Sequence, residues 1–367
     1  MAKSLQFLIS GGGTGGHLFP ALAIGAEIQS RKPEGLIHYV GSVFGLEANL
    51  FPEKNIDYSL LPIRGLQRGW NPAAWGKNSL LPFRLLLSWK KMKDIFQKIN
   101  PAVVIGTGGY ASAMPLYIAQ KRNIPTIIQE QNSYPGITTR RFAEKAEKVC
   151  IAFKETEAFI PGSNSILTGN PVRKEISHGN RPEAQRLFGL NPKQKTLFIF
   201  GGSQGSILLN EIIAEIYSDL LEANIQILWQ TGKLNYPKYK KYAGDGIRIR
   251  PFIEEMDKAY ACADLIISRA GALTISEITL CGKPSILIPF ASAAGDHQYR
   301  NAQAAAAAGA AILLTEKELS GETLIIQIKE LLSNESKLKS FAAASLALGQ
   351  PEATSKIVKH ILDAIHV

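Results

Sequence analysis

The chain has 367 residues, of which 46% are hydrophobic and 20% charged, a composition typical of globular proteins and sufficient for two domains. No apolar run reaches the roughly 18 to 20 residues of a membrane span, and the first residues lack the apolar stretch of a cleavable secretory signal. We therefore expect neither a transmembrane helix nor a signal peptide. The three cysteines are widely spaced without a C-x-x-C motif, which favours buried thiols in a reducing compartment over disulfides or zinc ligands.

The net charge of +10 is concentrated in the first half of the chain. Residues 64–98 alone hold eight Lys or Arg residues and a single Asp. A local excess of this kind indicates a negatively charged partner, such as a membrane surface or a nucleic acid.

The first predicted unit is a buried strand at residues 7–9, a glycine-rich turn at residues 11–16 and a helix that contains Pro20 in its first turn. Glycines at such a turn let backbone N–H groups and the positive end of the helix approach an anion closely. His17 follows the glycines, and the helix field disfavours its imidazolium form. We expect a neutral ring that accepts a proton. The alternative is a tight turn with an incidental histidine.

The same glycines also match the dinucleotide-binding pattern G-x-G-x-x-G, at Gly11, Gly13 and Gly16. That motif further requires an acidic residue at the end of the second strand, about 20 residues on. The predicted second strand, residues 36–40, is followed by Gly41 and Ser42. We therefore expect no nicotinamide or flavin cofactor.

Strand-like and helical stretches then alternate as in β-α-β units. A second glycine turn, Thr107 to Gly109, follows a predicted strand at 102–106. The strand at 126–128 ends in polar side chains at Gln129–Asn132, where ligands bind in open α/β sheets. Capping of the next helix is the alternative. Further strands are predicted at residues 58–62, 149–152 and 165–168.

The basic segment also carries apolar and aromatic side chains, which suits a patch on an anionic membrane surface. A helix with core-facing leucines and a solvated basic face is the alternative. Nucleic acid is disfavoured, because no recognition motif is present and the second half is nearly neutral. The residues assigned to the patch are Trp75, Leu80, Leu81, Phe83, Arg84, Trp89, Lys90 and Lys91.

The pattern of strand, glycine loop and helix recurs at residues 196–221 with the loop GGSQGS, and strands follow at 225–229, 247–251, 265–268 and 285–289. This recurrence predicts two Rossmann-like, doubly wound α/β domains facing across a cleft. We place them at residues 1–170 and 171–350, with a helix in 351–367 packing back on the first. Residues 270–277 open a helix whose free N–H groups suit a phosphate. Glu277 there suits a ribose diol or simply offsets the helix dipole.

Six sequence blocks, in order from about residue 5 to beyond residue 300, resemble the MurG family of bacterial cell-wall glycosyltransferases: GGGTGGHLFPALAI, GTGGYASAMPL, EQN followed by PG, GNPVR, GGSQGS, and RAGALTISE ahead of PF and HQYRNA. The resemblance implies a GT-B fold of the family 28 type. It implies inverting transfer of N-acetylglucosamine from UDP-N-acetylglucosamine (UDP-GlcNAc) to the C4 hydroxyl of a muramyl pentapeptide on undecaprenyl diphosphate, in peptidoglycan synthesis. It also implies a peripheral protein on the cytoplasmic side of the inner membrane, with no cofactor beyond the donor.

The resemblance further implies roles for individual residues. His17 is the expected base. A histidine is frequent in the family where this chain has Gln129, and an asparagine is frequent at Thr139, before Arg140. The expected donor-binding residues are Thr14, Gly15, Gly16, Asn132, Arg173, Ser203, Ile253, Ala272, Leu273, Thr274, Ile275, Ser276, Glu277, His297 and Gln298.

Two rival functions share some of these features. A UDP-sugar 2-epimerase has the same two-domain architecture but requires acidic catalytic groups and no lipid. A UDP-sugar sensor or membrane scaffold needs no base. The block GGTGGH and the basic apolar segment favour the transferase. No D-x-D motif is present, so we expect no obligatory metal ion.

Overall fold

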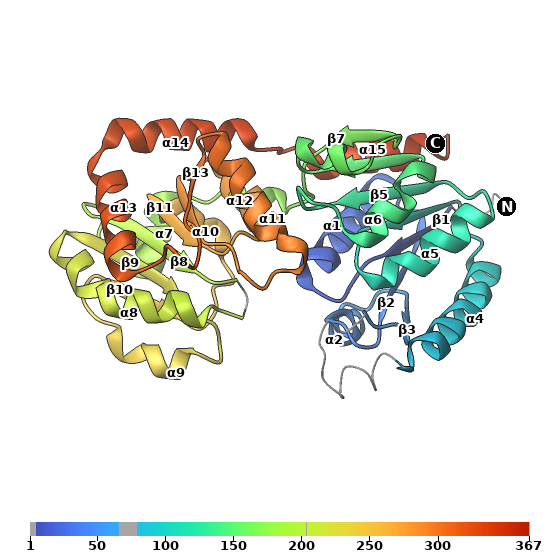
Figure 1. Cartoon of the computed structure of the whole chain (residues 1–367), viewed down its shortest axis with the longest axis horizontal. Coiled ribbons are helices and arrows are strands. Elements are labelled where there is room, and N and C mark those ends of the chain that lie inside the picture. The colour runs from blue at the N-terminus through green and yellow to red at the C-terminus, as the bar shows by residue number, and fades with distance from the viewer. Residues whose placement is uncertain (1–4, 66–78, 203, 367) are drawn as a thin grey trace. The chain divides into compact units, whose positions relative to one another are not determined.

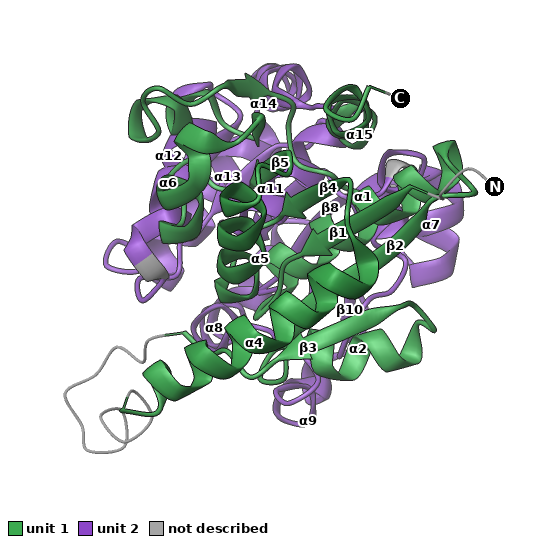
Figure 2. Ribbon diagram, turned by 90° about the vertical axis from the view of Figure 1, so that its right-hand side faces the viewer, with its two compact units in different colours: residues 1–172, 352–367 green, residues 173–351 purple. Residues whose placement is uncertain are grey.

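The structure, a computed structural model, describes residues 5–65, 79–202 and 204–366. It divides into two compact units (Figure 2). Unit 1 comprises residues 1–172 and 352–367, and unit 2 comprises residues 173–351. No described helix is both long enough and apolar enough to cross a membrane.

Unit 1 is built on a parallel sheet of seven strands in the order β3-β2-β1-β4-β5-β6-β7. The order reverses between β1 and β4, as in a doubly wound Rossmann-like sheet. The strands are β1 (Gln6–Ser10), β2 (Leu36–Ser42), β3 (Tyr58–Leu61), β4 (Val103–Gly106), β5 (Thr126–Glu130), β6 (Lys148–Ile151) and β7 (Ser165–Leu167). The helices are α1 (Gly15–Arg31), α2 (Glu47–Glu53), α4 (Leu81–Ile99), α5 (Tyr110–Lys121), α6 (Ile137–Phe142) and α15 (Ala353–Asp363).

Helices cover both faces of this sheet (Figure 1), because alternate residues of each strand point to opposite sides. Leu8 and Val104 pack with Phe96 of α4 and Leu116 of α5. Residues on the opposite face pack with α1 and α15; they are Phe7, Ile9, Val103 and Ile105, against Ile24, Ile28, Ile357 and Ile361. The C-terminal helix is thus part of the core of unit 1.

Two local expectations at the site are wrong. Helix α1 begins at Gly15, so His17 lies within its first turn and Pro20 lies inside the helix. Strand β5 continues to Glu130, because Gln129 and Glu130 still pair with Cys150 and Ile151 of β6. The side chains of Gln129 and Glu130 are therefore anchored by the sheet.

Helix α4 comes from the basic segment and is only half integrated into the core. Its second half buries Met92, Ile95 and Phe96. Its first half, with Leu80 just before it, leaves large apolar side chains exposed; they are Leu80, Phe83, Leu85, Leu86, Leu87 and Trp89. The alternative of core-facing leucines is wrong for this half. Trp75 lies outside the described residues.

Unit 2 repeats the architecture with six parallel strands in the order β10-β9-β8-β11-β12-β13. The strands are β8 (Lys195–Phe200), β9 (Ile225–Gln230), β10 (Ile247–Arg250), β11 (Leu265–Ser268), β12 (Ser285–Leu287) and β13 (Ala311–Leu313). The helices are α7 (Arg181–Phe188), α8 (Ile207–Glu222), α9 (Tyr236–Tyr239), α10 (Met256–Cys262), α11 (Ala272–Leu280), α12 (His297–Ala307), α13 (Gly321–Ser333) and α14 (Glu335–Leu348). Strand β13 escaped prediction because it spans three residues after an alanine-rich helix.

Candidate active site

Two glycine turns of unit 1 meet beside the His17 ring. They follow β1 and β4, the neighbouring strands at which the sheet order reverses. Gly108 and Gly109 have φ values of +97° and +75°. A Cβ on Gly108 would lie 2.7 Å from His17 Nδ1, and one on Gly109 would lie 2.3 Å from the Gly12 carbonyl oxygen. The second turn therefore has to be glycine for the first turn and His17 to pack on it.

His17 is half-buried and its Nδ1 atom faces two oxygens. Nδ1 lies 3.1 Å from the Thr107 carbonyl oxygen and 2.8 Å from Gln131 Oε1. The Thr107 hydroxyl in turn donates to the His17 carbonyl oxygen at 2.8 Å. These contacts fix the ring from the side of Nδ1.

Gln131 belongs to the EQN block but was not singled out in the sequence. Its amide nitrogen donates to the Thr107 carbonyl at 2.8 Å and the Gln129 carbonyl at 3.0 Å, and also contacts Gln129 Oε1. Gln129 donates in turn to Asn170 Oδ1 at 3.0 Å. All three amides are buried. The signal for Gln131 was its place in the polar run Gln129–Asn132 that the sequence marked at the end of a strand, although no role was assigned to it there.

Glu47 is a second residue that sequence reasoning missed. Its side chain is fully buried behind the first glycine loop and accepts the Gly13 N–H at 2.9 and 3.0 Å and the Ser42 N–H at 2.8 Å. One N–H of the predicted phosphate cradle thus already binds a carboxylate. The signal was weak, because Glu47 lies five residues beyond the end of β2 and not at the ribose-binding position.

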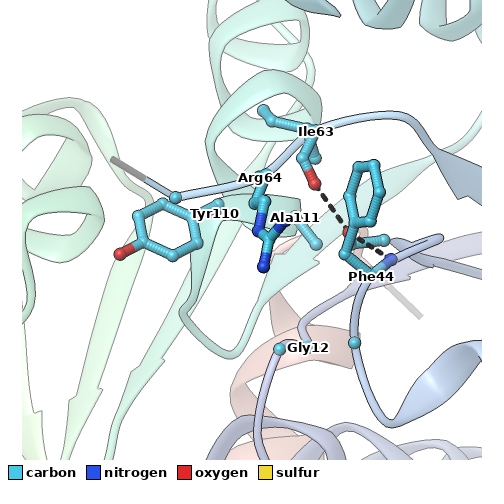
Figure 3. Close-up of a pocket in the computed structure, with 10 residues that line it drawn as sticks. Gly12, Phe44, Ile63, Arg64, Tyr110 and Ala111 are labelled. Carbon is cyan, nitrogen blue, oxygen red and sulfur yellow. Dashed lines mark hydrogen bonds between the residues drawn. The ribbon is translucent and has the colours of Figure 1, made fainter. Parts of the chain in front are cut away.

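A cavity of about 170 Å³ opens beside the first glycine loop of unit 1. Figure 3 shows the Arg64 guanidinium between Tyr110 and the ring of Phe44. Gly12 lies below them in this view and lines the same cavity. Arg64 and Arg84 lie 5.4 and 4.9 Å from the Phe44 ring centroid. The cavity therefore combines a cation, two aromatic rings and glycine backbone.

The other predicted donor residues of unit 1 flank His17. Thr14 precedes α1, and its carbonyl accepts the N–H groups of His17 and Leu18. Gly15 and Gly16 form the first turn, whose N–H groups have no acceptor within the helix. Asn132, next to Gln131, donates from its backbone and side chain to Glu130 Oε1.

In unit 2, α11 begins at Ala272 directly after the turn that follows β11. Ala272, Leu273 and Thr274 form its first turn, the part of a helix whose N–H groups have no acceptor within the helix. Ile275 is buried and donates its N–H to the Gly271 carbonyl at 2.9 Å. The Ser276 hydroxyl contacts the Ala272 carbonyl at 3.0 Å. The start of α11 is thus a helix N-terminus at the carboxyl end of a parallel strand, the arrangement also found at α1.

Glu277 lies one turn further along α11 and accepts a hydrogen bond of 2.9 Å from the Tyr260 hydroxyl. Burial raises the pKa of Glu277, while the Tyr260 hydroxyl and the charge of Arg173 act in the opposite direction. Burial and the neighbouring Glu277 raise the pKa of Tyr260 well above its usual value, so this hydroxyl stays protonated and donates. The structure thus brings the predicted residues Arg173 and Glu277 together.

Gln230 organises the glycine loop of unit 2 and the segment around Ile253. Its Oε1 accepts the Ile253 N–H at 2.8 Å, and its Nε2 donates to the Gly202 carbonyl at 3.2 Å. The Ile253 N–H is thus already paired. Gln298 Oε1 accepts the Phe290 N–H at 2.9 Å, and His297 precedes it at the start of α12. Ser203 lies outside the described residues.

Arg269 was also missed, although it opens the block RAGALTISE. It forms an ion pair of 2.6 Å with Glu316 and donates to the Ser206 hydroxyl at 3.2 Å and the Pro289 carbonyl at 3.2 Å. Ser206 caps α8 by accepting the Leu209 N–H. Arg269 therefore ties the glycine loop of unit 2 to the segment after β12.

Within residues 5–65, 79–202 and 204–366, no three His, Cys, Asp or Glu side chains come together as a metal site. The site residues of both units are arranged in the same way. Glycine-rich turns and helix N-termini follow the carboxyl ends of parallel strands, and buried amides or carboxylates hold them.

Comparison with known proteins shows which family the chain is related to. Residues 7–151 match the glycosyltransferase family 28 N-terminal domain, and residues 196–361 match the glycosyltransferase family 28 C-terminal domain. A curated relative from Flavobacterium psychrophilum is 43% identical over 366 residues, covering 99% of this chain and 98% of its own. It is named UDP-N-acetylglucosamine--N-acetylmuramyl-(pentapeptide) pyrophosphoryl-undecaprenol N-acetylglucosamine transferase.

Solved structures agree with this relationship. The crystal structure of Acinetobacter baumannii MurG is 28% identical and superposes with a TM-score of 0.78, covering 98% of this chain and 99% of the other. The UDP-GlcNAc 2-epimerase of Neisseria meningitidis, at 14% identity and a TM-score of 0.65 over 98% of this chain and 100% of the other, shares the fold alone. The predicted GT-B fold of two Rossmann-like domains is confirmed, and the chain belongs to the MurG family within glycosyltransferase family 28.

Proposed function

We propose that the protein transfers N-acetylglucosamine from UDP-GlcNAc to the C4 hydroxyl of muramyl-pentapeptide-diphosphoryl-undecaprenol, converting lipid I to lipid II with inversion at the anomeric carbon. The observation that carries this function is the 43% identity, over 99% of the chain, to a relative named for this reaction. The donor sugar is the only co-substrate of the reaction, and no further cofactor takes part.

In the proposed mechanism His17 is the general base. As the acceptor oxygen bonds to the anomeric carbon, the bond to the UDP oxygen breaks, the proton moves to His17 and the electron pair leaves with UDP. N–H groups at helix N-termini, such as that of α11, stabilise the charge that develops on the diphosphate. The close packing of the glycine turns against His17 supports this role, because Gly108 and Gly109 place no side chain against the ring.

Incubation with UDP-GlcNAc and a lipid I analogue tests the function directly. The transferase yields a disaccharide, an epimerase yields the epimerised UDP-sugar, and a sensor yields no turnover. In His17→Ala we expect the chemical step to slow by about 100-fold or more, with donor affinity kept. Unchanged single-turnover rates would overturn the base assignment.

We propose that the donor contacts residues from both units. In unit 2 its uracil lies near Ile253, its ribose on Glu277, its diphosphate on residues 272–276 and its sugar near His297 and Gln298. The raised pKa of Glu277 and the first turn of α11 support this placement. Contacts from the remaining predicted residues complete the set: Thr14, Gly15, Gly16, Asn132, Arg173 and Ser203.

We further propose that unit 1 binds the cytoplasmic face of the inner membrane peripherally through α4. Phe83 and Leu86 are 61% and 60% exposed, and Arg84, Lys90 and Lys91 lie on the same helix. Apolar side chains among cations suit an anionic lipid surface, each cation contributing about 1 kcal/mol. Arg84 also touches Phe44 at the rim of the cavity, which links this surface to the first glycine loop.

Charge reversal tests the membrane surface. Glutamate at Arg84, Lys90 and Lys91 together is expected to abolish binding to anionic liposomes while UDP affinity stays unchanged. The matched control reverses Lys54, Lys121 and Lys145, which are exposed in the same unit outside α4. Equal loss in both triple variants would show a general charge effect and overturn the assignment to α4.

A further inference from the structure

We propose that Gln131, held by Gln129 and Asn170, is a positioning residue that keeps His17 in the Nδ1–H tautomer and so leaves Nε2 as the basic atom. This inference rests on the proposed function and deepens it by assigning the atom that takes the proton. The amide chain is formed by Gln129, by Gln131 of the sequence block EQN and by the asparagine of GNPVR, at the ends of β5 and β7.

The orientation of each amide follows from its neighbours. The Gln131 nitrogen faces three oxygens: the Thr107 carbonyl, the Gln129 carbonyl and Gln129 Oε1. The reverse orientation would place four oxygens together without a proton, so Gln131 Oε1 has to face His17. Gln129 Nε2 donates to Asn170 Oδ1, and Asn170 Nδ2 donates to the Gln131 carbonyl at 3.1 Å. The three amides thus close a ring of mutually consistent hydrogen bonds.

The tautomer of His17 follows from these acceptors. Gln131 Oε1 and the Thr107 carbonyl oxygen, at 2.8 and 3.1 Å from Nδ1, both require a proton on Nδ1. A neutral imidazole with a proton on Nδ1 carries its lone pair on Nε2. In the other tautomer the Nδ1 lone pair would face two oxygens, which is repulsive.

Burial makes this arrangement stiff. Gln129 is fully buried, and Gln131 and Asn170 are each 2% exposed, so water does not replace a lost partner without a cavity or a rearrangement. The amides also remain neutral at every pH, unlike a carboxylate facing Nδ1. They therefore direct the proton without placing a negative charge beside His17.

The test compares isosteric variants of the full-length protein. Gln131→Met and Gln129→Met remove the amide at similar length, whereas Gln129→His keeps one acceptor and one donor nitrogen. Gln226→Met is the matched control, because Gln226 is an equally buried amide of unit 2 that donates to the Asn191 carbonyl and Thr196 hydroxyl. The tautomer is read from long-range ¹⁵N–¹H NMR correlations of ¹⁵N-histidine protein, with His17 assigned by its loss in His17→Gln.

We expect the Nδ1–H tautomer in the wild type and in Gln129→His, a substantial Nε2–H population in Gln131→Met, and a smaller one in Gln129→Met, where two backbone carbonyls still hold the Gln131 amide. The kcat of Gln131→Met is expected to fall at least tenfold with KM for UDP-GlcNAc within twofold of wild type, while Gln226→Met retains activity. A wild-type Nε2–H tautomer, an unchanged tautomer and kcat in Gln131→Met, or an equal loss in Gln226→Met would overturn the proposal. The NMR result does not depend on turnover, so failure of the proposed function is seen separately as absence of disaccharide from the wild type.

Discussion

At the scale of single residues, the charge state of Glu277 decides how well unit 2 can hold a ribose. Its carboxylate sits where burial raises its pKa, and the Tyr260 hydroxyl offsets part of that effect. An ionised carboxylate accepts hydrogen bonds from both hydroxyls of a diol, whereas a protonated one accepts fewer and more weakly. Burial thus couples donor binding to pH.

We predict that UDP affinity falls on acidification at a pH above the range of an ordinary glutamate. The raised pKa means that the free protein takes up a proton at Glu277 more readily, and binding has to displace it. Glu277→Gln is expected to weaken UDP by about tenfold to a hundredfold near neutral pH, in line with about 1.5 to 3 kcal/mol for a charged hydrogen bond, and to flatten the pH dependence. Calorimetric titration at several pH values checks both effects.

Tyr260→Phe is the companion variant. It removes the hydroxyl that lowers the pKa of Glu277, so the loss of affinity is expected to begin at higher pH than in the wild type. Glu277 also affects the free energy of unfolding. Because folding raises the pKa of its carboxyl group, its contribution to stability is fully present below the unfolded pKa and is lost as the pH rises through the folded pKa. An affinity profile identical to wild type would contradict the role of this hydroxyl.

At the scale of elements, the glycine turns after β1 and β4 act as one unit with the start of α1. Gly109 offers a direct test, because Gly162 of the same unit has the same φ of +75° but open space around its Cβ position. The two positions therefore compare a crowded glycine with an open one.

We predict that Gly162→Ala lowers the free energy of unfolding by about 1 to 2 kcal/mol, the strain of a left-handed alanine. Gly109→Ala is expected to lose a further 1 to 3 kcal/mol or so, because its Cβ meets the Gly12 carbonyl and because a φ of +75° with a ψ of 176° is a conformation that alanine hardly adopts. It should also reduce turnover by shifting His17, whereas Gly162→Ala should not. Urea unfolding and disaccharide formation measure the two effects; equal values for both variants would contradict the coupling of the two turns.

The strands and helices were largely predictable from the sequence, whereas the contacts between them were not. The buried strands such as Leu265–Ser268 were found because a continuous apolar run flanked by turns has few other solutions. The partners of His17 were not found, because the contact to Gln131 joins residues 114 positions apart. Likewise nothing in the local sequence shows that the Glu47 carboxylate folds back onto Gly13. Such contacts depend on the order of the strands in the sheet, which cannot be read from one amino-acid sequence.

At the scale of the whole molecule, the chain passes through unit 2 and returns to complete unit 1. Helix α15 places Ile357, Val358 and Ile361 in the core that α1 and the sheet of unit 1 form, and all three are fully buried. The amphipathic pattern at the end of the sequence was compatible with this packing but did not by itself predict it. Its consequence is that unit 1, which holds His17, is stabilised by the last residues of the chain.

We predict that Ile361→Ala destabilises unit 1 selectively, by about 2 to 5 kcal/mol for the cavity that it leaves. Hydrogen exchange should show lost protection in α1 and β1, while α8 and β8 of unit 2 exchange at wild-type rates. Ile326→Ala is the control, because Ile326 lies in α13 of unit 2 and is 53% exposed; it should leave both units unchanged. Loss of protection in unit 2 equal to that in unit 1 would mean that the two units unfold together, and that α15 stabilises the molecule as a whole.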